Sequence, residues 1–230
     1  HPNALSSYQA LCLSLATRLG SGNLAGVAFA LTSGGPGAVF WMWVSALIGM
    51  VISFAECSLA QLYKERDTEN QMRGGPAWYM ARGLGMRWMG VLFSVFLLLT
   101  YGLIFNTIQS SAVARAMHFA WQVPEIASGL VLAAVSLFFI VKGLKPAARL
   151  MQWIVPVMGL AWVLVSVGIG LWHANLLPGI FATIIKSAFG WQEAATGTMA
   201  YTLSQAMTSG FQRSMFANEA GLGSSPNAAA

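Results

Sequence analysis

The chain has 230 residues, of which 57% are hydrophobic and only 8% are charged, and its mean hydropathy is +0.64. A soluble domain carries roughly 25% charged residues, so this composition excludes an ordinary soluble domain and predicts a membrane protein. The 12 lysines and arginines exceed the 7 acidic residues, for a formal charge of +5. Because these cations lie in loops between apolar segments, they indicate membrane topology rather than nucleic-acid binding.

Six apolar segments are predicted to form membrane helices, each of which needs about 20 residues to cross the hydrocarbon. The segments run from Tyr8 to Leu31, Ala38 to Tyr63, Trp88 to Phe119, Ile126 to Val141, Leu150 to Trp172 and Ala195 to Asn218. The stretch from Leu176 to Gly190 is apolar but short, and it carries Pro178 and Lys186. We expect it to form a helix lying in the membrane interface, with a collapsed loop as the alternative.

Positive charge orients these segments. The second and fourth connections carry most of the cations, namely Lys64, Arg66, Arg73, Arg82, Arg87, Lys142, Lys145 and Arg149. Such loops stay in the cytoplasm, so we expect a cytoplasmic N-terminus and a sixth segment that begins outside and runs inward. The first and sixth segments then cross the membrane in opposite directions.

Two glycine-rich breaks interrupt those two segments. The first is Gly20-Ser21-Gly22-Asn23, and the second is Asn218-Glu219-Ala220-Gly221-Leu222-Gly223-Ser224. Each glycine costs about 1 kcal/mol in a helix interior, and unwound backbone at membrane depth persists only where protein buries it or it lines a polar cavity. Broken helices in corresponding halves of a membrane chain are typical of a transporter's substrate site.

We therefore predict an all-α polytopic membrane protein with an inverted-repeat transporter core and discontinuous helices. Residues 1–172 are expected to form the first five-helix repeat, 173–194 an extracellular loop with an interfacial helix, and 195–230 the truncated start of the second repeat. The chain begins without an initiator Met and stops shortly after the second break, so we expect it to be an internal piece of a longer protein.

Four motifs resemble, in the same order, those of the alanine or glycine:cation symporter family. They are GSGNLAGVA at 20–28, GGPGAVFWMW at 34–43, GGPAWY at 74–79 and FANEAGLGSSP at 216–226. The resemblance runs from about Ser7 to the end of the chain. The family usually has Thr where Ser21 stands, and this departure keeps the hydroxyl group. The resemblance also implies one more helix before this chain and several after it.

What the resemblance implies is a transporter rather than an enzyme. Members have a leucine-transporter-like fold and import alanine, glycine or a related small amino acid with sodium, or sometimes with protons. The expected reaction is therefore sodium-coupled symport by alternating access across the plasma membrane, which is the cell inner membrane of a bacterium. Its partners would be the amino acid, the co-transported Na⁺ and the bilayer, with no other cofactor. A proton-coupled or exchange carrier of the same fold is the alternative.

The breaks also predict individual contacts. Freed backbone N–H groups at a helix N-terminus attract a carboxylate, while freed carbonyl groups take an ammonium group or sodium. The resemblance places Phe216 and Leu222 beside the ligand, and Gln109 is either a polar ligand contact or a bridge between helices. The predicted substrate-binding set is Gly20, Ser21, Gly22, Asn23, Gln109, Phe216, Gly221, Leu222 and Gly223.

Charged residues within the apolar segments need partners or cavities, since each costs roughly 2.5–3.5 kcal/mol at the bilayer centre. Asn23 and Glu219 are the candidates for ion coupling or gating. Glu56 and Arg213 are expected to have structural roles. An acidic residue such as Glu56 would form an ion pair with Arg18 or Arg213. Gly22 and Gly26 also form a small-xxx-small pair, which by itself indicates close helix packing.

Two other classes of membrane protein fit less well. A membrane-embedded enzyme would need catalytic pairs, whereas His1, His118 and His173 lie at segment ends or at the chain start. A channel would show a polar stripe along one helix rather than isolated breaks.

Overall fold

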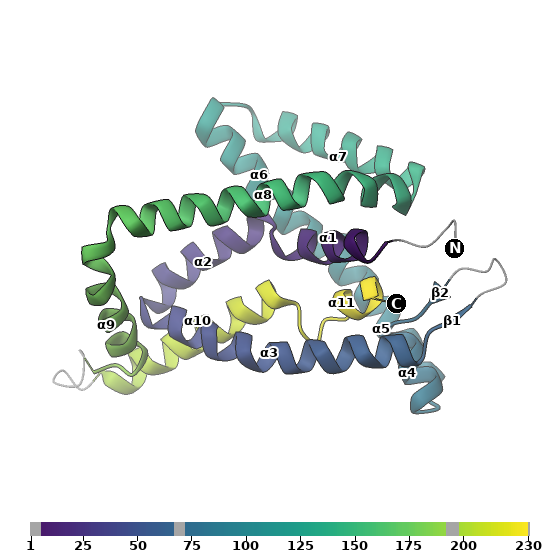
Figure 1. Cartoon of the computed structure of the whole chain (residues 1–230), viewed down its shortest axis with the longest axis horizontal. Helices are drawn as coiled ribbons and strands as arrows, with labels where there is room; N and C mark the ends of the chain where they lie inside the picture. Colours follow the sequence, from purple (N-terminus) through teal and green to yellow (C-terminus); the bar gives the residue numbers. More distant parts are fainter. Residues whose placement is uncertain (1–5, 67–71, 192–197, 230) are drawn as a thin grey trace. The chain divides into compact units, whose positions relative to one another are not determined.

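The computed structural model describes residues 6–66, 72–191 and 198–229, and almost all of this part of the chain is helical (Figure 1). η1 is a π-helix and η2 is a 3₁₀-turn. In chain order the elements are α1 (Ser7–Arg18), α2 (Ser21–Gly34), α3 (Gly37–Leu62), β1 (Glu65–Arg66), β2 (Met72–Arg73), α4 (Pro76–Gly83), α5 (Arg87–Leu99), η1 (Thr100–Phe105), α6 (Asn106–Trp121), α7 (Glu125–Lys142), α8 (Leu144–Trp172), η2 (Ala174–Leu176), α9 (Leu177–Ala188), α10 (Met199–Asn218) and α11 (Ser224–Ala229).

Local sequence signals account for several helix ends. Ser6 and Gln9 form a capping box at the start of α1, in which each side chain accepts the other residue's N–H at 3.1 Å, as such pairs do. Pro76 lies in the first turn of α4, where its missing N–H costs nothing. Gly143, with φ +86°, ends α7, because glycine adopts a positive φ without strain.

Four helical stretches have the length and apolar composition to cross a membrane. They are Gly37–Leu62, Arg87–Trp121, Glu125–Lys142 and Pro146–Trp172. At most 17% of the residues in their apolar windows are buried, so most of their apolar side chains face outward, as a hydrocarbon environment favours. This agrees with the prediction of a polytopic, all-α membrane protein and matches the second to fifth predicted segments.

The third predicted segment is less regular than we expected. A single α-helix was predicted from Trp88 to Phe119, but η1 separates α5 from α6 within it. Two side chains at the start of α6 donate hydrogen bonds to carbonyl groups of η1. Asn106 Nδ2 donates to the Gly102 carbonyl at 3.3 Å, and Thr107 Oγ1 donates to the Leu103 carbonyl at 2.7 Å. Short π-helical turns of this kind are frequent at functional sites.

The later segments differ mainly at their ends. α8 begins at Leu144 rather than Leu150 and continues through Pro156. The stretch expected as an interfacial helix or a collapsed loop is helical, as α9; its position at a membrane surface stays a prediction. The sixth segment begins at Met199 as α10, while the predicted start at Ala195 lies outside the described residues.

The residue contacts divide the chain into two compact units made of discontinuous segments. The first unit comprises His1–Gly22, Ser53–Pro156 and Gly221–Ala230, and the second comprises Asn23–Ile52 and Val157–Ala220. Each glycine break therefore lies where the chain passes from one unit to the other. The division into two repeats stays a prediction.

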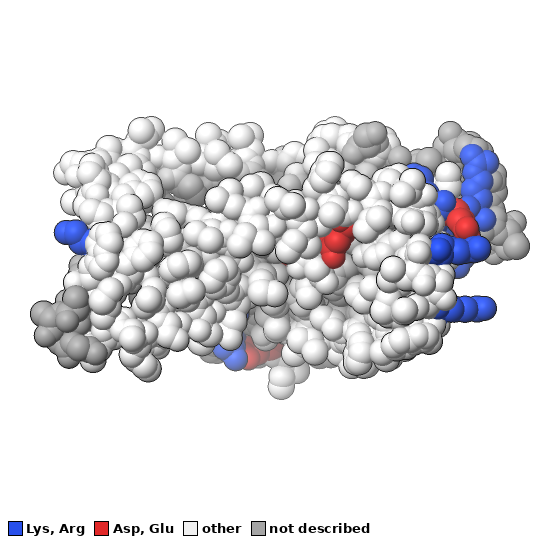
Figure 2. Space-filling model, turned by 90° about the horizontal axis from the view of Figure 1, so that it is seen from below, with Lys and Arg blue, Asp and Glu red and all other residues white. Residues whose placement is uncertain are grey.

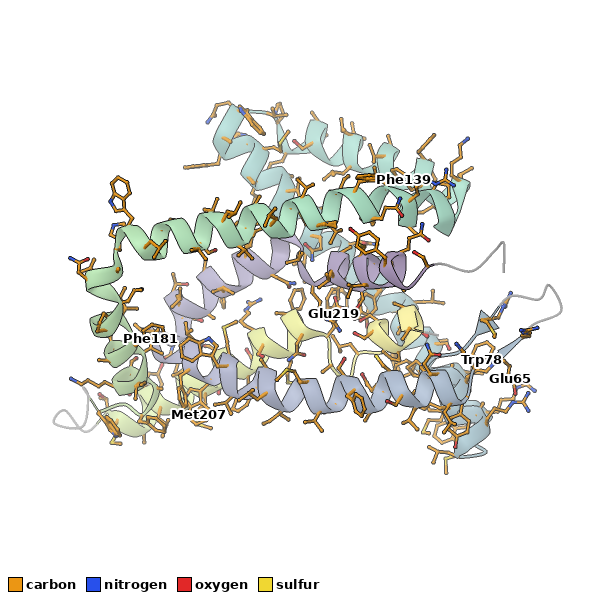
Figure 3. The ribbon with its side chains drawn as sticks, in the orientation of Figure 1. Glu65, Trp78, Phe139, Phe181, Met207 and Glu219 are labelled. Carbon is orange, nitrogen blue, oxygen red and sulfur yellow. The ribbon has the colours of Figure 1, made fainter. Side chains whose placement is uncertain are left out.

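Cationic side chains gather at one end of the first unit. There, β1 and β2 form an antiparallel pair in which Glu65 faces Arg73, and Arg82 of α4 donates to the Glu65 carboxylate at 2.9 Å. Figure 2 shows most of the lysines and arginines in its view at this end, where Figure 3 labels Glu65 and Trp78. This arrangement agrees with the expected location of positive charge in the connection between α3 and α5.

Small residues control the packing of the second unit. A Cβ atom on Gly37 would lie 2.5 Å from the Ala188 backbone nitrogen, and one on Gly210 would lie 2.6 Å from the Ala38 carbonyl oxygen. Trp41 Nε1 also donates to the Ala188 carbonyl at 2.9 Å. The GGPGAVFWMW motif at 34–43 thus allows the turn between α2 and α3 to pack closely against the C-terminal end of α9 and against α10.

The close approach at Gly210 predicts that an added methyl group destabilises the protein. We expect Gly210→Ala to lower the free energy of unfolding by about 1–3 kcal/mol, because overpacking forces the backbone apart. Gly168→Ala in α8 is the control, since no atom lies within 4 Å of the position that its added methyl group would take. Thermal unfolding of the full-length variants in detergent measures the effect; equal stability of the two variants would contradict the packing described here.

Candidate functional site

The first break is a short interruption between α1 and α2. α1 ends at Arg18, the Leu19 N–H still donates to the Leu15 carbonyl at 3.0 Å, and a new helix begins at Ser21. The break is therefore confirmed, but it is narrower than predicted: only Leu19 and Gly20 lie between the helices. Gly22 and Asn23 lie in the first turn of α2, where backbone N–H groups have no partner within the helix.

Gln109 of α6 supplies one of the missing acceptors. Its Oε1 atom accepts the Gly22 N–H at 2.8 Å and lies 3.4 Å from the Ser21 hydroxyl, which donates to it. The structure thus brings together four predicted site residues, Gly20, Ser21, Gly22 and Gln109, within the first unit. Gln109 is a bridge between segments in this structure; contact with a ligand stays a prediction.

Glycine makes this approach possible. A Cβ atom on Gly20 would lie 2.5 Å from Gln109 Nε2, and one on Gly22 would lie 3.0 Å from Gln109 Oε1. Any larger residue at either position would displace the carboxamide. The two glycines therefore keep open a space beside the N-terminus of α2 that is large enough for one polar group from another element.

The second break begins where α10 ends. Glu219 adopts a left-handed conformation, with φ +54°, and its N–H donates to the Met215 carbonyl at 3.2 Å. Glu219 lies at the end of α10 (Figure 3) and is only 2% exposed. Asn218 stabilises the turn, because its Oδ1 atom accepts the Ala220 N–H at 2.9 Å.

The rest of the second break belongs to the first unit. Gly221 and Gly223 have φ angles of +83° and +85°, which only glycine adopts readily. The Gly221 N–H donates to Glu56 Oε2 of α3 at 3.2 Å. A Cβ atom on Gly223 would lie 2.6 Å from the Phe93 ring of α5, so this glycine also permits close packing.

Glu56 makes a structural contact, but its partner is not the one that the sequence indicated. We expected a structural pair with Arg18 or Arg213, but no ion pair of Glu56 occurs among the described residues, and its carboxylate binds the backbone of the second break instead. Tyr79 of α4 lies near it. Burial, with added negative charge from Glu56 and Cys57, raises the pKa of Tyr79 to about 12, so Tyr79 stays neutral at physiological pH.

The two arginines also make other contacts. Arg18 donates to the Ser14 hydroxyl at 2.8 Å and to the Ser225 hydroxyl at 2.6 Å. It therefore joins α1, which precedes the first break, to α11, which follows the second, and the two helices pack together (Figure 1). The Arg213 guanidinium lies over the Phe29 ring, 4.5 Å from its centroid, in a cation–π contact.

The remaining predicted residues are distributed between the units. Asn23 and Phe216 belong to the second unit and Leu222 to the first, and each is half-buried. Their roles at a ligand stay predictions. Sequence reasoning missed the partner of Glu56 and the Arg18–Ser225 bond, because both join positions more than 160 residues apart.

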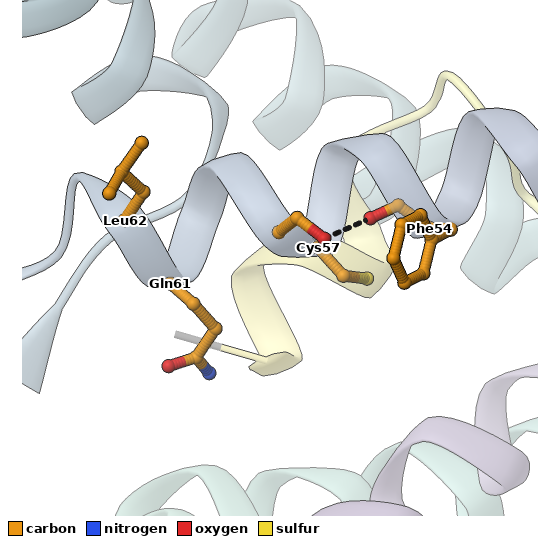
Figure 4. A pocket seen from close by; sticks show the side chains of 5 residues that line it. Phe54, Cys57, Gln61 and Leu62 are labelled. Atoms are coloured by element: carbon orange, nitrogen blue, oxygen red, sulfur yellow. Dashed lines mark hydrogen bonds between the residues drawn. The ribbon is translucent and has the colours of Figure 1, made fainter.

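Two shallow surface hollows are each lined by a single helix. Phe54, Cys57, Ser58, Gln61 and Leu62 of α3 line the first (Figure 4). In it, the Ser58 hydroxyl donates to the Phe54 carbonyl of its own helix at 2.8 Å. The second follows one face of α10 from Ala200 to Met215. Within the described part of the chain, neither hollow has lining residues from a second element.

Removing the Glu56 acceptor should loosen the second break. We expect Glu56→Leu to remove the acceptor of the Gly221 N–H and to accelerate amide exchange in residues 219–224 by about tenfold or more. Glu56→Gln keeps an acceptor oxygen and should have a much smaller effect.

Hydrogen–deuterium exchange of the full-length protein measures this difference. Ser58→Ala is the control, because this hydroxyl bonds only within α3 among the interactions described. If exchange in 219–224 is the same in wild type and Glu56→Leu, Glu56 does not hold the break.

Comparison with known proteins shows the family of the chain. The sequence pattern of the "Sodium:alanine symporter family" matches residues 1–230. The chain is 64% identical over 229 residues to the uncharacterized transporter YaaJ of Escherichia coli (strain K12), covering 100% of the chain and 48% of that protein.

Two further relatives have more informative names. The chain is 46% identical to the amino-acid carrier protein AlsT of Bacillus subtilis (strain 168), covering 98% of the chain and 48% of the relative. It is 38% identical to the sodium/alanine symporter AgcS of Methanococcus maripaludis, covering 98% of the chain and 50% of the relative. The chain thus spans about half the length of these relatives. It belongs to the sodium:alanine symporter family, a family of membrane transporters.

Proposed function

We propose that the protein is a sodium-coupled symporter that imports a small neutral amino acid, alanine or glycine, across the bacterial inner membrane by alternating access. The observation that carries this proposal is the first break, where the Gly22 N–H at the start of α2 binds a side-chain oxygen at 2.8 Å. A substrate carboxylate needs the same kind of donor. Sodium as the coupling ion and alanine as a substrate are proposed because the family description names both.

The proposed site combines the two breaks. Gly20, Ser21 and Gly22 would bind the carboxylate, while freed carbonyl groups near Gly221 and Gly223 would accept from the ammonium group. Phe216 and Leu222 would limit the size of the substrate side chain. This assignment places the breaks in the first helices of two inverted five-helix repeats, residues 1–172 and the repeat that begins at 195.

Sodium is the proposed second cargo. It prefers oxygen ligands, and discontinuous helices provide carbonyl oxygens for it. The Asn23 amide oxygen is the proposed side-chain contribution, and Glu219 is proposed for coupling or gating because it is buried within the second break. Sodium binding would stabilise the outward-open state, which the amino acid then closes.

Uptake into proteoliposomes tests the proposal. With an inward sodium gradient, the full-length protein should accumulate radiolabelled alanine or glycine, and Asn23→Ala should reduce sodium-driven uptake at least tenfold. Uptake that a proton gradient drives equally well without sodium would favour the proton-coupled alternative. Absence of uptake of both amino acids under either gradient would contradict the proposed substrate class.

A neutral substitution tests the proposed role of Glu219. We expect Glu219→Gln to lower the transport rate about tenfold while membrane expression stays unchanged, because a buried charge in a membrane protein usually serves function. Glu125→Gln is the control, since Glu125 is exposed in the first turn of α7. Wild-type uptake by Glu219→Gln would exclude Glu219 from coupling.

A further inference from the structure

In the structure, the first break is closed by the protein itself. The carboxamide oxygen of Gln109 accepts the Gly22 N–H at 2.8 Å and the Ser21 hydroxyl at 3.4 Å. The helix offers these donors at the positions where the proposed function requires the substrate carboxylate. Gln109 is half-buried, and its side chain comes from α6, which is far from the break in sequence.

The Gln109 carboxamide lies directly against the backbone of Gly20 at the break. Even a single methyl group on Gly20 would lie 2.5, 2.8 and 2.9 Å from the terminal atoms of Gln109. Non-bonded carbon atoms need about 3.5–4.0 Å. The Gly22 N–H already donates to Gln109 Oε1, so a carboxylate could accept this N–H only after the Gln109 carboxamide has moved away.

The chemistry favours such an exchange. A hydrogen bond from N–H to a carboxylate is roughly twice as strong as one to a neutral amide, so a substrate carboxylate can displace the carboxamide. Gln109 has the advantage of being attached to the protein, which raises its effective concentration at the break. A neutral side chain can thus satisfy the N–H group while the site is empty and still be replaced.

We infer that Gln109 is an internal competitor of the substrate: its carboxamide caps the first break in the empty transporter and must leave before an amino-acid carboxylate binds. This inference rests on the proposed function and assigns a regulatory role to one residue of that site. Gln109 then limits affinity, and it favours ligands with a carboxylate because weaker acceptors cannot displace it.

An irregular helical turn precedes Gln109 in the chain. η1 ends at Phe105, four positions before Gln109, and π-helical turns are common where function requires irregular geometry. Tyr101 and Phe105 stack within η1, with ring centroids 4.7 Å apart. The inferred exchange requires the Gln109 side chain to rotate away from the Gly22 N–H.

Binding of radiolabelled alanine to the purified full-length protein, in sodium, tests the competition. If Gln109 competes, Gln109→Ala should bind alanine about two- to tenfold more tightly, the factor expected for loss of one ordinary hydrogen bond. Gln109→Asn keeps an amide on the helix but is one carbon too short to reach Gly22, so it should also bind more tightly. Gln109→Glu places a charged acceptor at the break and should bind more weakly than wild type.

Ser111→Ala is the matched control, because this exposed hydroxyl of α6 bonds only the Ile108 carbonyl of its own helix among the interactions described; it should bind alanine like wild type. If Gln109→Ala unfolds, Gln109→Asn gives the answer. Weaker binding by Gln109→Asn and by any folded Gln109→Ala would make Gln109 a direct substrate ligand and overturn the inference, while the proposed function would stand. No binding of alanine or glycine by wild type, with sodium or at any proton concentration, would instead overturn the proposed function.

Discussion

The structure depends on one constraint: a backbone N–H group that a helix leaves free must find an acceptor, and at membrane depth water cannot supply it. Both breaks in this chain create such groups. The side-chain oxygens of Gln109 and Glu56 satisfy the Gly22 and Gly221 N–H groups, respectively. The breaks are thus supported by polar side chains that α6 and α3 hold in place, and these polar side chains explain how unwound segments persist between apolar helices.

The glycines serve two physical purposes that sequence alone does not separate. Gly221 and Gly223 provide positive φ angles at the second break. Gly37 and Gly210 instead permit close packing, because backbone atoms of neighbouring elements occupy the space of a side chain. Gly20 and Gly22 leave room for a polar group from another element, which is the Gln109 carboxamide in this structure. In the inferred exchange, the substrate carboxylate would take its place.

Much of this organisation could be predicted from the sequence. Apolar length identified the spanning helices, and glycine spacing located both breaks, because these signals are local. The π-helix at Thr100–Phe105 was missed, since its residues are ordinary helix formers apart from Gly102. The Glu56–Gly221 and Arg18–Ser225 contacts were also missed, because the pairing of residues distant in sequence depends on the fold. The sequence identified Gln109 as polar but gave no sign of its partner.

In the proposed transporter, the Gly22 N–H at the first break receives the substrate carboxylate. The most direct measurement is a cryo-electron microscopy structure of the full-length protein with alanine and sodium bound. A carboxylate oxygen should lie about 2.9 Å from the Gly22 nitrogen, a normal hydrogen-bond distance, with the Gln109 carboxamide displaced. Alanine bound elsewhere, with the Gln109–Gly22 hydrogen bond intact, would contradict this assignment.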